Sequence, residues 1–161
     1  MAISSKLDGF KMTVIPEFIE KAQQLDPVLK EWMVEPKACI RIAKENGDWK
    51  KIDESSLSDL DKLVCGRGDA LCLDFGDHEV GYFSFTVIPV GSPPDAPAYL
   101  QLKFGETLCE IGEDSADYKG SLSSSWIQEE RIHIDVLPAR ISLPRRYAFR
   151  YVEIRVLDVS P

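Results

Sequence analysis

Apolar and polar side chains alternate with a period of two over most of the chain from about residue 70 onward. Phe83, Phe85 and Val87 alternate with more polar neighbours, and the same pattern returns in residues 148–159. This alternation is typical of strands that turn one face toward a core. The predicted strands are residues 70–76, 80–90, 98–106, 126–136, 139–144 and 148–159.

The connections between these strands are irregular and several are long. Residues 91–97 (GSPPDAP) and 109–125 are rich in turn-forming and polar residues, and neither has the apolar periodicity of a crossover helix. Strands joined in this way favour an antiparallel arrangement over a parallel α/β sheet. We therefore expect a mainly β fold, an antiparallel β-sandwich of the jelly-roll or concanavalin-like type, preceded by a short helical lead-in.

The lead-in carries a different periodicity. In residues 12–36 apolar side chains recur at spacings of three and four, which predicts amphipathic helix. Pro27 interrupts the pattern, so we expect two short helices with a break between them. Residues 38–44 and 49–52 alternate like strands around the turn 45–48 (ENGD), which predicts a β-hairpin.

An acidic, serine-rich connection, residues 53–62, follows the hairpin and can hold one helical turn. We expect two parts on this basis. Residues 1–69 form a helical and hairpin lead-in that packs on the sandwich, and residues 70–161 form the sandwich itself.

The charge balance argues against two classes of partner. The 161 residues contain 19 Lys plus Arg against 27 Asp plus Glu, a formal net charge of −8. Nucleic acids and anionic membranes attract cationic surfaces, so neither is expected as a partner. The first residues lack the continuous apolar segment of a secretory signal, so we expect either a cytoplasmic protein or a fragment of a larger protein whose localisation is unknown.

The four cysteines, Cys39, Cys65, Cys72 and Cys109, form no CxxC pair. Structural zinc sites usually take two ligands from one short turn, so no such site is expected. Cys72 lies in an apolar run and is predicted to be a buried thiol. A single disulfide, for example between Cys65 and Cys109, stays an open alternative.

Four short motifs occur in order along the strand-rich region: Asp-Phe-Gly at 74–76, Val-Gly-Tyr at 80–82, Gly-Glu at 105–106 and Phe-Arg-Tyr-Val at 149–152. Together they resemble the β-sandwich domain that precedes the catalytic domain of α-L-rhamnosidases in glycoside hydrolase family 78. The resemblance covers about residues 70–161. The motifs themselves serve sheet packing, with Arg150 placed to stack on an aromatic ring or to pair with a carboxylate such as Asp74.

In that family, hydrolysis is carried out by carboxylates of a following helical toroid, and these have no counterpart in this sequence. The resemblance therefore implies a non-catalytic accessory domain that contacts such a toroid or self-associates, with residues 139–151 as a candidate contact. The alternatives are an interaction module or a freestanding small β-sandwich enzyme acting on a small molecule. His78 and His133 are the acid–base candidates for that enzyme.

Carbohydrate binding is a further expectation for the accessory domain. Sugars are held by an aromatic plane against their C–H face and by polar groups around their hydroxyls. The candidate residues are Asp117, Tyr118, Trp126, Gln128 and Glu129. The alternative for Trp126 is core packing at the start of a strand.

The same segment holds an acidic run, Glu113, Asp114 and Asp117. Several oxygen ligands together suit a hard cation, so the run is a candidate calcium site, with plain solvation as the alternative. No other cofactor is expected.

Overall fold

The computed structural model describes residues 13–91 and 97–158. It divides the chain into two compact units, residues 1–33 and 34–161, each of which is described by itself. In the first unit, helix α1 (Pro16–Leu25) begins with a proline, whose fixed φ suits a first helical position.

The prediction of a second helix after Pro27 is wrong, because residues 26–36 contain no helix. Asp26 is already extended, with φ −59° and ψ 123°, as the residue before a proline tends to be. The segment between Pro27 and Pro36 is shorter than an isolated helix needs to be stable in water.

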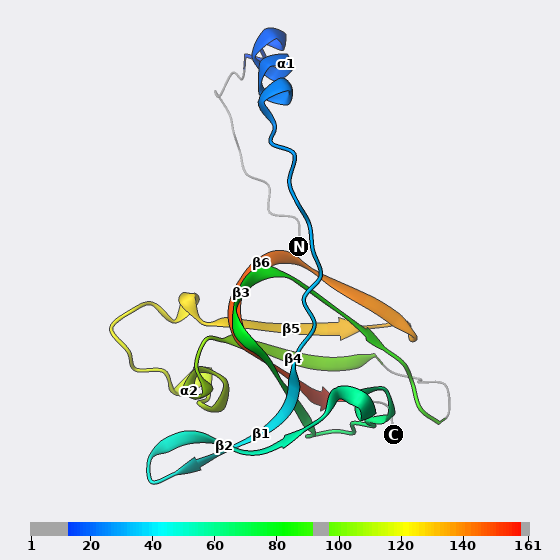
Figure 1. The fold of residues 1–161 in the computed structure, drawn as a ribbon, viewed down its shortest axis with the longest axis vertical. Helices are drawn as coiled ribbons and strands as arrows, with labels where there is room; N and C mark the ends of the chain where they lie inside the picture. The colour runs from blue at the N-terminus through cyan, green and yellow to red at the C-terminus, as the bar shows by residue number, and fades with distance from the viewer. Residues whose placement is uncertain (1–12, 92–96, 159–161) are drawn as a thin grey trace. The chain divides into compact units, whose positions relative to one another are not determined.

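The second unit is built on one antiparallel sheet of six strands in the order β2-β1-β3-β6-β4-β5 (Figure 1). The mainly β, antiparallel prediction is confirmed. The strands are β1 (Ala38–Glu45), β2 (Asp48–Ser55), β3 (Ala70–Val87), β4 (Ala98–Gly105), β5 (Gln128–Ile134) and β6 (Ala139–Asp158). Short helical segments follow β2 and β4: η1 (Leu57–Lys62), α2 (Leu108–Gly112), η2 (Ser115–Asp117) and η3 (Ser124–Trp126).

Strands β3 and β6, of 18 and 20 residues, are longer than predicted, because each joins two of the expected strands into one. Their pairing shifts register between Asp74 and Glu79 and again between Tyr82 and Ser84. Gly76 lies inside the first irregularity with φ +83°, a value that favours glycine. Both strands curve strongly along their length (Figure 1).

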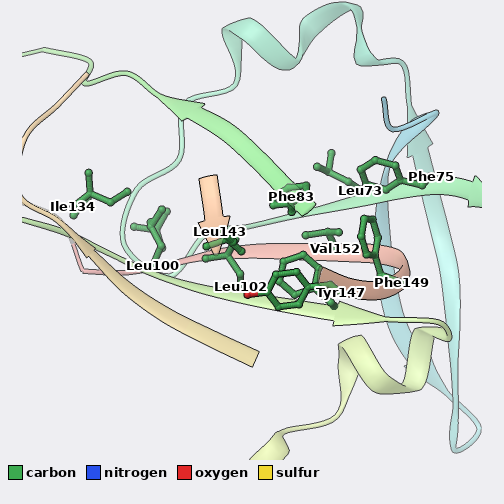
Figure 2. Close-up of a cluster of buried hydrophobic side chains, with 13 residues drawn as sticks. Leu73, Phe75, Phe83, Leu100, Leu102, Ile134, Leu143, Tyr147, Phe149 and Val152 are labelled. Carbon is green, nitrogen blue, oxygen red and sulfur yellow. The ribbon is translucent and has the colours of Figure 1, made fainter. Parts of the chain in front are cut away.

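The curvature brings side chains from non-adjacent strands into one core. Phe83 on β3 and Phe104 on β4 have ring centroids 5.4 Å apart, although β6 separates these strands in the sheet. Phe104 also stacks on Tyr147 of β6 at 4.0 Å. Figure 2 shows the apolar side chains of β3, β4, β5 and β6 converging in this cluster. A sheet folded over its own core in this way is consistent with a β-sandwich.

The hairpin of β1 and β2 is confirmed, with Asn46 at φ +52° and Gly47 at φ +93° in its turn. It does more than pack on the sandwich, since β1 hydrogen-bonds to the beginning of β3 and extends the sheet. This pairing places the hairpin strands beside α2, on the side of the unit where the candidate site lies.

Among the described residues, no helix is long and apolar enough to cross a membrane. All four cysteines are free thiols, so the alternative of a Cys65–Cys109 disulfide is not realised. Cys72 is buried as predicted, and burial raises the pKa of its thiol to about 12.

Candidate functional site

A groove of about 490 Å³ lies between the start of β2, the segment that leads into α2, and β6. Its walls combine aromatic, carboxylate and hydroxyl groups, and it is open to solvent. The residues that line it are Asp48, Trp49, Glu106, Thr107, Leu108, Cys109 and Tyr151. We call this the β2–α2 groove.

Trp49 is held in one orientation. Its indole N–H donates to Oε1 of Glu113 at 2.8 Å, and Lys44 Nζ donates to the same oxygen at 2.5 Å. Lys44 also lies 5.8 Å from the centroid of the Trp49 ring. A Cβ added at Gly112 would overlap the indole, so the ring rests directly on a backbone that only glycine leaves free.

The Lys44 ammonium, and then the Trp49 indole, lower the pKa of Glu113 below its ordinary value. Glu113 therefore stays ionised at neutral pH, and its contacts fix the Trp49 ring from the edge while Gly112 supports one face. The aromatic wall of the groove is thus formed before any ligand arrives.

Tyr151 forms another wall and is 9% exposed. The Arg150 guanidinium lies 4.9 Å from its ring centroid. Burial, and then the nearby Asp74 carboxylate, raise the pKa of Tyr151. Its phenol therefore remains protonated at neutral pH and can both donate and accept a hydrogen bond.

Next to Tyr151, the predicted pairing of Arg150 with Asp74 is confirmed. Arg150 donates from Nε to Oδ1 at 3.0 Å and from Nη2 to Oδ2 at 3.2 Å, and the amide of Gly76 donates to Oδ1 at 2.7 Å. Burial alone would raise the pKa of Asp74, but the hydrogen bonds from Arg150 and Gly76 outweigh it and lower the pKa. The pair ties the irregular turn of β3 to β6.

The rim of the groove is polar. Thr107 Oγ1 donates to Glu110 Oε1 at 3.0 Å, and Glu110 Oε2 accepts from the Glu106 amide at 2.8 Å, which caps the start of α2. The Glu106 carboxylate lies 3.3 Å from Nε2 of His78. The Asp48 carboxylate makes no hydrogen bond or ion pair with any residue in the described ranges, so it is available to a ligand.

The residues predicted to bind carbohydrate lie elsewhere, on and after the segment 113–127, which we call the acidic loop. Trp126 is 76% exposed, so the alternative of core packing is wrong. Tyr118 and Asp117 are also exposed. The structure does not gather these side chains around a groove.

Gln128 and Glu129 are occupied within the protein. Gln128 exchanges two hydrogen bonds with the backbone of Ala148. Glu129 accepts from Gln101 at 2.6 Å, from Arg131 at 3.1 Å and from the hydroxyl of Ser115. Burial raises the pKa of Glu129, but these donors outweigh it and lower the pKa. Carbohydrate binding at these residues stays a prediction, with few free polar groups to support it.

The acidic run predicted to hold calcium is divided among different contacts. Glu113 is bound to Lys44 and Trp49, and Asp114 accepts from the amide of Ala116 at 2.9 Å. Asp117 lies exposed in η2. Within the described residues, no group of three or more His, Cys, Asp or Glu side chains could hold a metal ion. The three carboxylates are therefore not brought together here, and calcium binding by this run stays a prediction.

The acid–base candidates also lie apart. His133 stacks on Tyr99 with ring centroids 4.1 Å apart on the exposed face of β5 and β4. His78 lies at the Asp74–Glu79 irregularity of β3 and pairs with Glu106.

Sequence reasoning missed Asp48, Trp49 and Tyr151 as a possible site. The local pattern alone places Trp49 and Tyr151 in strands and Asp48 in a turn, and gives no sign that they meet. Their meeting depends on the pairing of β1 with β3 and of β3 with β6, which no local spacing reveals.

The chain was compared with known proteins. Residues 36–161 match the sequence profile described as the glycosyl hydrolase family 78 alpha-rhamnosidase N-terminal domain. No curated protein sequence matches significantly. A solved structure, a rhamnosidase from Klebsiella oxytoca with rhamnose bound, is similar with a TM-score of 0.79 and 44% identity. The match covers 92% of this chain and 29% of that chain.

Proposed function

Because the chain belongs to the family of N-terminal domains of glycosyl hydrolase family 78 α-rhamnosidases, we propose that it is a non-catalytic accessory domain of a rhamnoside-cleaving enzyme. One observation carries the proposal: nearly all of this chain aligns with less than a third of the Klebsiella oxytoca rhamnosidase. Most of that enzyme, including more than enough sequence for a separate catalytic domain, lies outside the match.

The chemistry of the described carboxyl groups supports a non-catalytic role. Glycoside hydrolysis needs a carboxylic acid that donates a proton and a second carboxylate opposite it, and the acid commonly has a raised pKa. The carboxyl groups with shifted pKa are all lowered: Asp74, Asp77, Glu113 and Glu129. Each is bound to a cation or a hydrogen-bond donor, which suits a structural acceptor and not a proton donor.

We assign the contact with the catalytic partner to the outer face of the long β3–β6 pair. Val80 and Tyr82 are 62% and 70% exposed there. Tyr82 lies opposite Arg146 in the register, and Thr86 lies opposite Arg140. Neither arginine has an ionic partner in the described part of the chain. Exposed apolar groups beside unpaired cations suit a protein surface of mixed apolar and acidic character.

The test is a chimera in which this chain replaces the matching segment of the Klebsiella oxytoca rhamnosidase. We expect the chimera to hydrolyse an aryl α-L-rhamnoside. An otherwise identical chimera with Arg146→Glu should unfold at a lower temperature, because the reversed charge faces an acidic partner surface. Lys119→Glu on the acidic loop is the matched control and should leave the unfolding temperature unchanged.

Two outcomes would contradict the proposal. A folded chimera without hydrolytic activity would contradict the accessory role. Equal effects of Arg146→Glu and Lys119→Glu would contradict the assigned contact face. The remaining alternative is that this face mediates self-association. Light scattering on the isolated chain tests it, because a dimer that dissociates in the Arg146→Glu variant would assign this face to self-association.

A further inference from the structure

We propose that the β2–α2 groove binds a neutral pyranose sugar. The inference names a ligand for the accessory domain, and it rests on the proposed function only for the choice of L-rhamnose as the first probe. The features that carry it are a fixed indole, a protonated phenol and an unpaired carboxylate, which meet in one open groove.

The aromatic part of the site is formed in advance. Sugar rings bind by laying an apolar C–H face on an aromatic plane, and a plane that is already fixed loses little entropy on binding. Gly112 and Glu113 fix the Trp49 indole without a ligand. Trp49 is half-buried and lines the open groove, so the part of its ring that the protein leaves uncovered offers such a plane.

The polar part of the site has the right number and kind of groups. The Tyr151 phenol can donate or accept, and the carboxylates of Asp48 and Glu106 can each accept from sugar hydroxyls. Thr107 adds a hydroxyl oxygen that can only accept, because its proton is donated to Glu110. A few convergent polar groups on an otherwise apolar or aromatic surface are typical of small-molecule sites.

The charge of the groove selects among sugars. Asp48 and Glu106 bring negative charge to its rim, whereas the nearby cations Lys44 and Arg150 are already bound to Glu113 and Asp74. Phosphorylated sugars and uronic acids would therefore be repelled, and neutral sugars would not. The open side of the groove leaves room for the sugar to be one unit of a longer glycan.

The experiment is a titration of the ¹⁵N-labelled 161-residue chain with L-rhamnose, D-galactose and D-glucose, followed by NMR. Sodium D-glucuronate is the anionic control. We expect at least one neutral sugar to shift the Trp49 indole signal and the amides of residues 48–49 and 106–109. The Kd should be about millimolar, as suits one sugar ring on an open surface. Glucuronate should cause smaller shifts.

Two pairs of variants localise the binding. Trp49→Ala should weaken it by about tenfold or more, while Trp126→Ala on the acidic loop should leave it unchanged. Asp48→Asn removes a charge from the exposed first residue of β2 without disturbing the packing, and should weaken binding by about three- to tenfold. Asp135→Asn, at another exposed position, is its control. The amide spectrum of each variant shows whether the fold is kept.

The proposal is overturned if no neutral sugar shifts the groove signals at about 100 mM, two orders of magnitude above the expected Kd. Shifts that map to Tyr118 and Trp126, or that disappear with Trp126→Ala, would also overturn it and return the site to the acidic loop. Because this readout needs no catalytic partner and the chimera needs no occupied groove, each proposal can fail without the other.

Discussion

The β2–α2 groove and the acidic loop contain the same kinds of residues, but the surrounding protein holds the aromatic side chains firmly only in the groove. Each has a tryptophan, a tyrosine and several carboxylates. In the groove, Trp49 lies on Gly112 with its N–H bound to Glu113, and the Tyr151 ring lies 4.9 Å from the Arg150 guanidinium. On the loop, Trp126 is 76% exposed.

The difference shows that residues of suitable type form a binding site only where the fold holds them in place. The groove draws its residues from a hairpin, a short helix and a long strand, so packing from several directions fixes each aromatic ring. The loop draws its residues from one stretch of chain, and its aromatic rings have few neighbours to hold them. Binding residues need to be held in place before the ligand arrives.

The largest expected effect lies under the groove. Arg150→Met removes the guanidinium and leaves the Asp74 carboxylate, whose side chain is 9% exposed, with only the Gly76 amide. We expect a loss of about 2–3 kcal/mol in the free energy of unfolding. This is less than a fully buried pair would lose, because the Arg150 side chain is 40% exposed. Urea denaturation measures it, and a loss below about 0.5 kcal/mol would contradict the account.

The pH dependence of that loss sharpens the prediction. The folded state lowers the pKa of Asp74 below its ordinary 3.8, so the ion pair stabilises the fold above that pH and is lost as the pH falls through the folded-state value. The difference in the free energy of unfolding between the wild type and Arg150→Met should therefore become smaller as the pH falls into the acid range. A difference that stays constant from pH 6 to about pH 3 would show that Arg150 acts through packing alone.

A matched pair of glycines gives the next effect. A Cβ at Gly112 would overlap the Trp49 ring, and a Cβ at Gly120 would overlap the end of the Tyr118 side chain. Gly112→Ala should cost about 1–2 kcal/mol, because the indole is held and cannot move aside easily. Gly120→Ala should change stability by less than about 0.5 kcal/mol, because the exposed Tyr118 can rotate away. Thermal unfolding of the two variants measures both losses of stability. Equal losses would contradict the account in which the Trp49 ring is held and the Tyr118 ring is free to move.

The smallest effect concerns motion and not stability. In the wild type, the ¹⁵N heteronuclear NOE of the Trp49 indole should be higher than that of Trp126. Glu113→Gln removes the ionic contact with Lys44 while keeping an acceptor for the indole. The heteronuclear NOE of the Trp49 indole should therefore fall slightly, and that of the Trp126 indole should not change. Equal NOE values for both indoles in the wild type would contradict the proposed preorganisation.

The sequence was informative where structure follows from local pattern. Period-two alternation predicted the strands, the Asn-Gly turn predicted the hairpin, and the motif carrying Arg150 suggested its pairing with Asp74. The continuity of β3 and of β6 was not predicted, because Gly76 and the nearby polar residues give the same local signal for a bulge as for a loop.

The candidate site was not predicted, for a physical reason. Asp48 and Trp49 meet Tyr151 only because β1 pairs with β3 and β3 pairs with β6, and strand order is set by the whole core. The sequence pattern instead favours Tyr118 and Trp126 for sugar binding, because they lie close together in one polar segment. Nothing in the local pattern shows that Gln128 and Glu129 are already bound within the protein.

The most direct test is whether the purified 161-residue chain releases 4-nitrophenol from 4-nitrophenyl α-L-rhamnoside. We predict no release above the buffer blank at any pH at which the chain is folded, while the Klebsiella oxytoca rhamnosidase under the same conditions serves as the active reference. Turnover by the chain alone that persists through repeated purification would mean that it carries its own proton donor and nucleophile, and would contradict the accessory role.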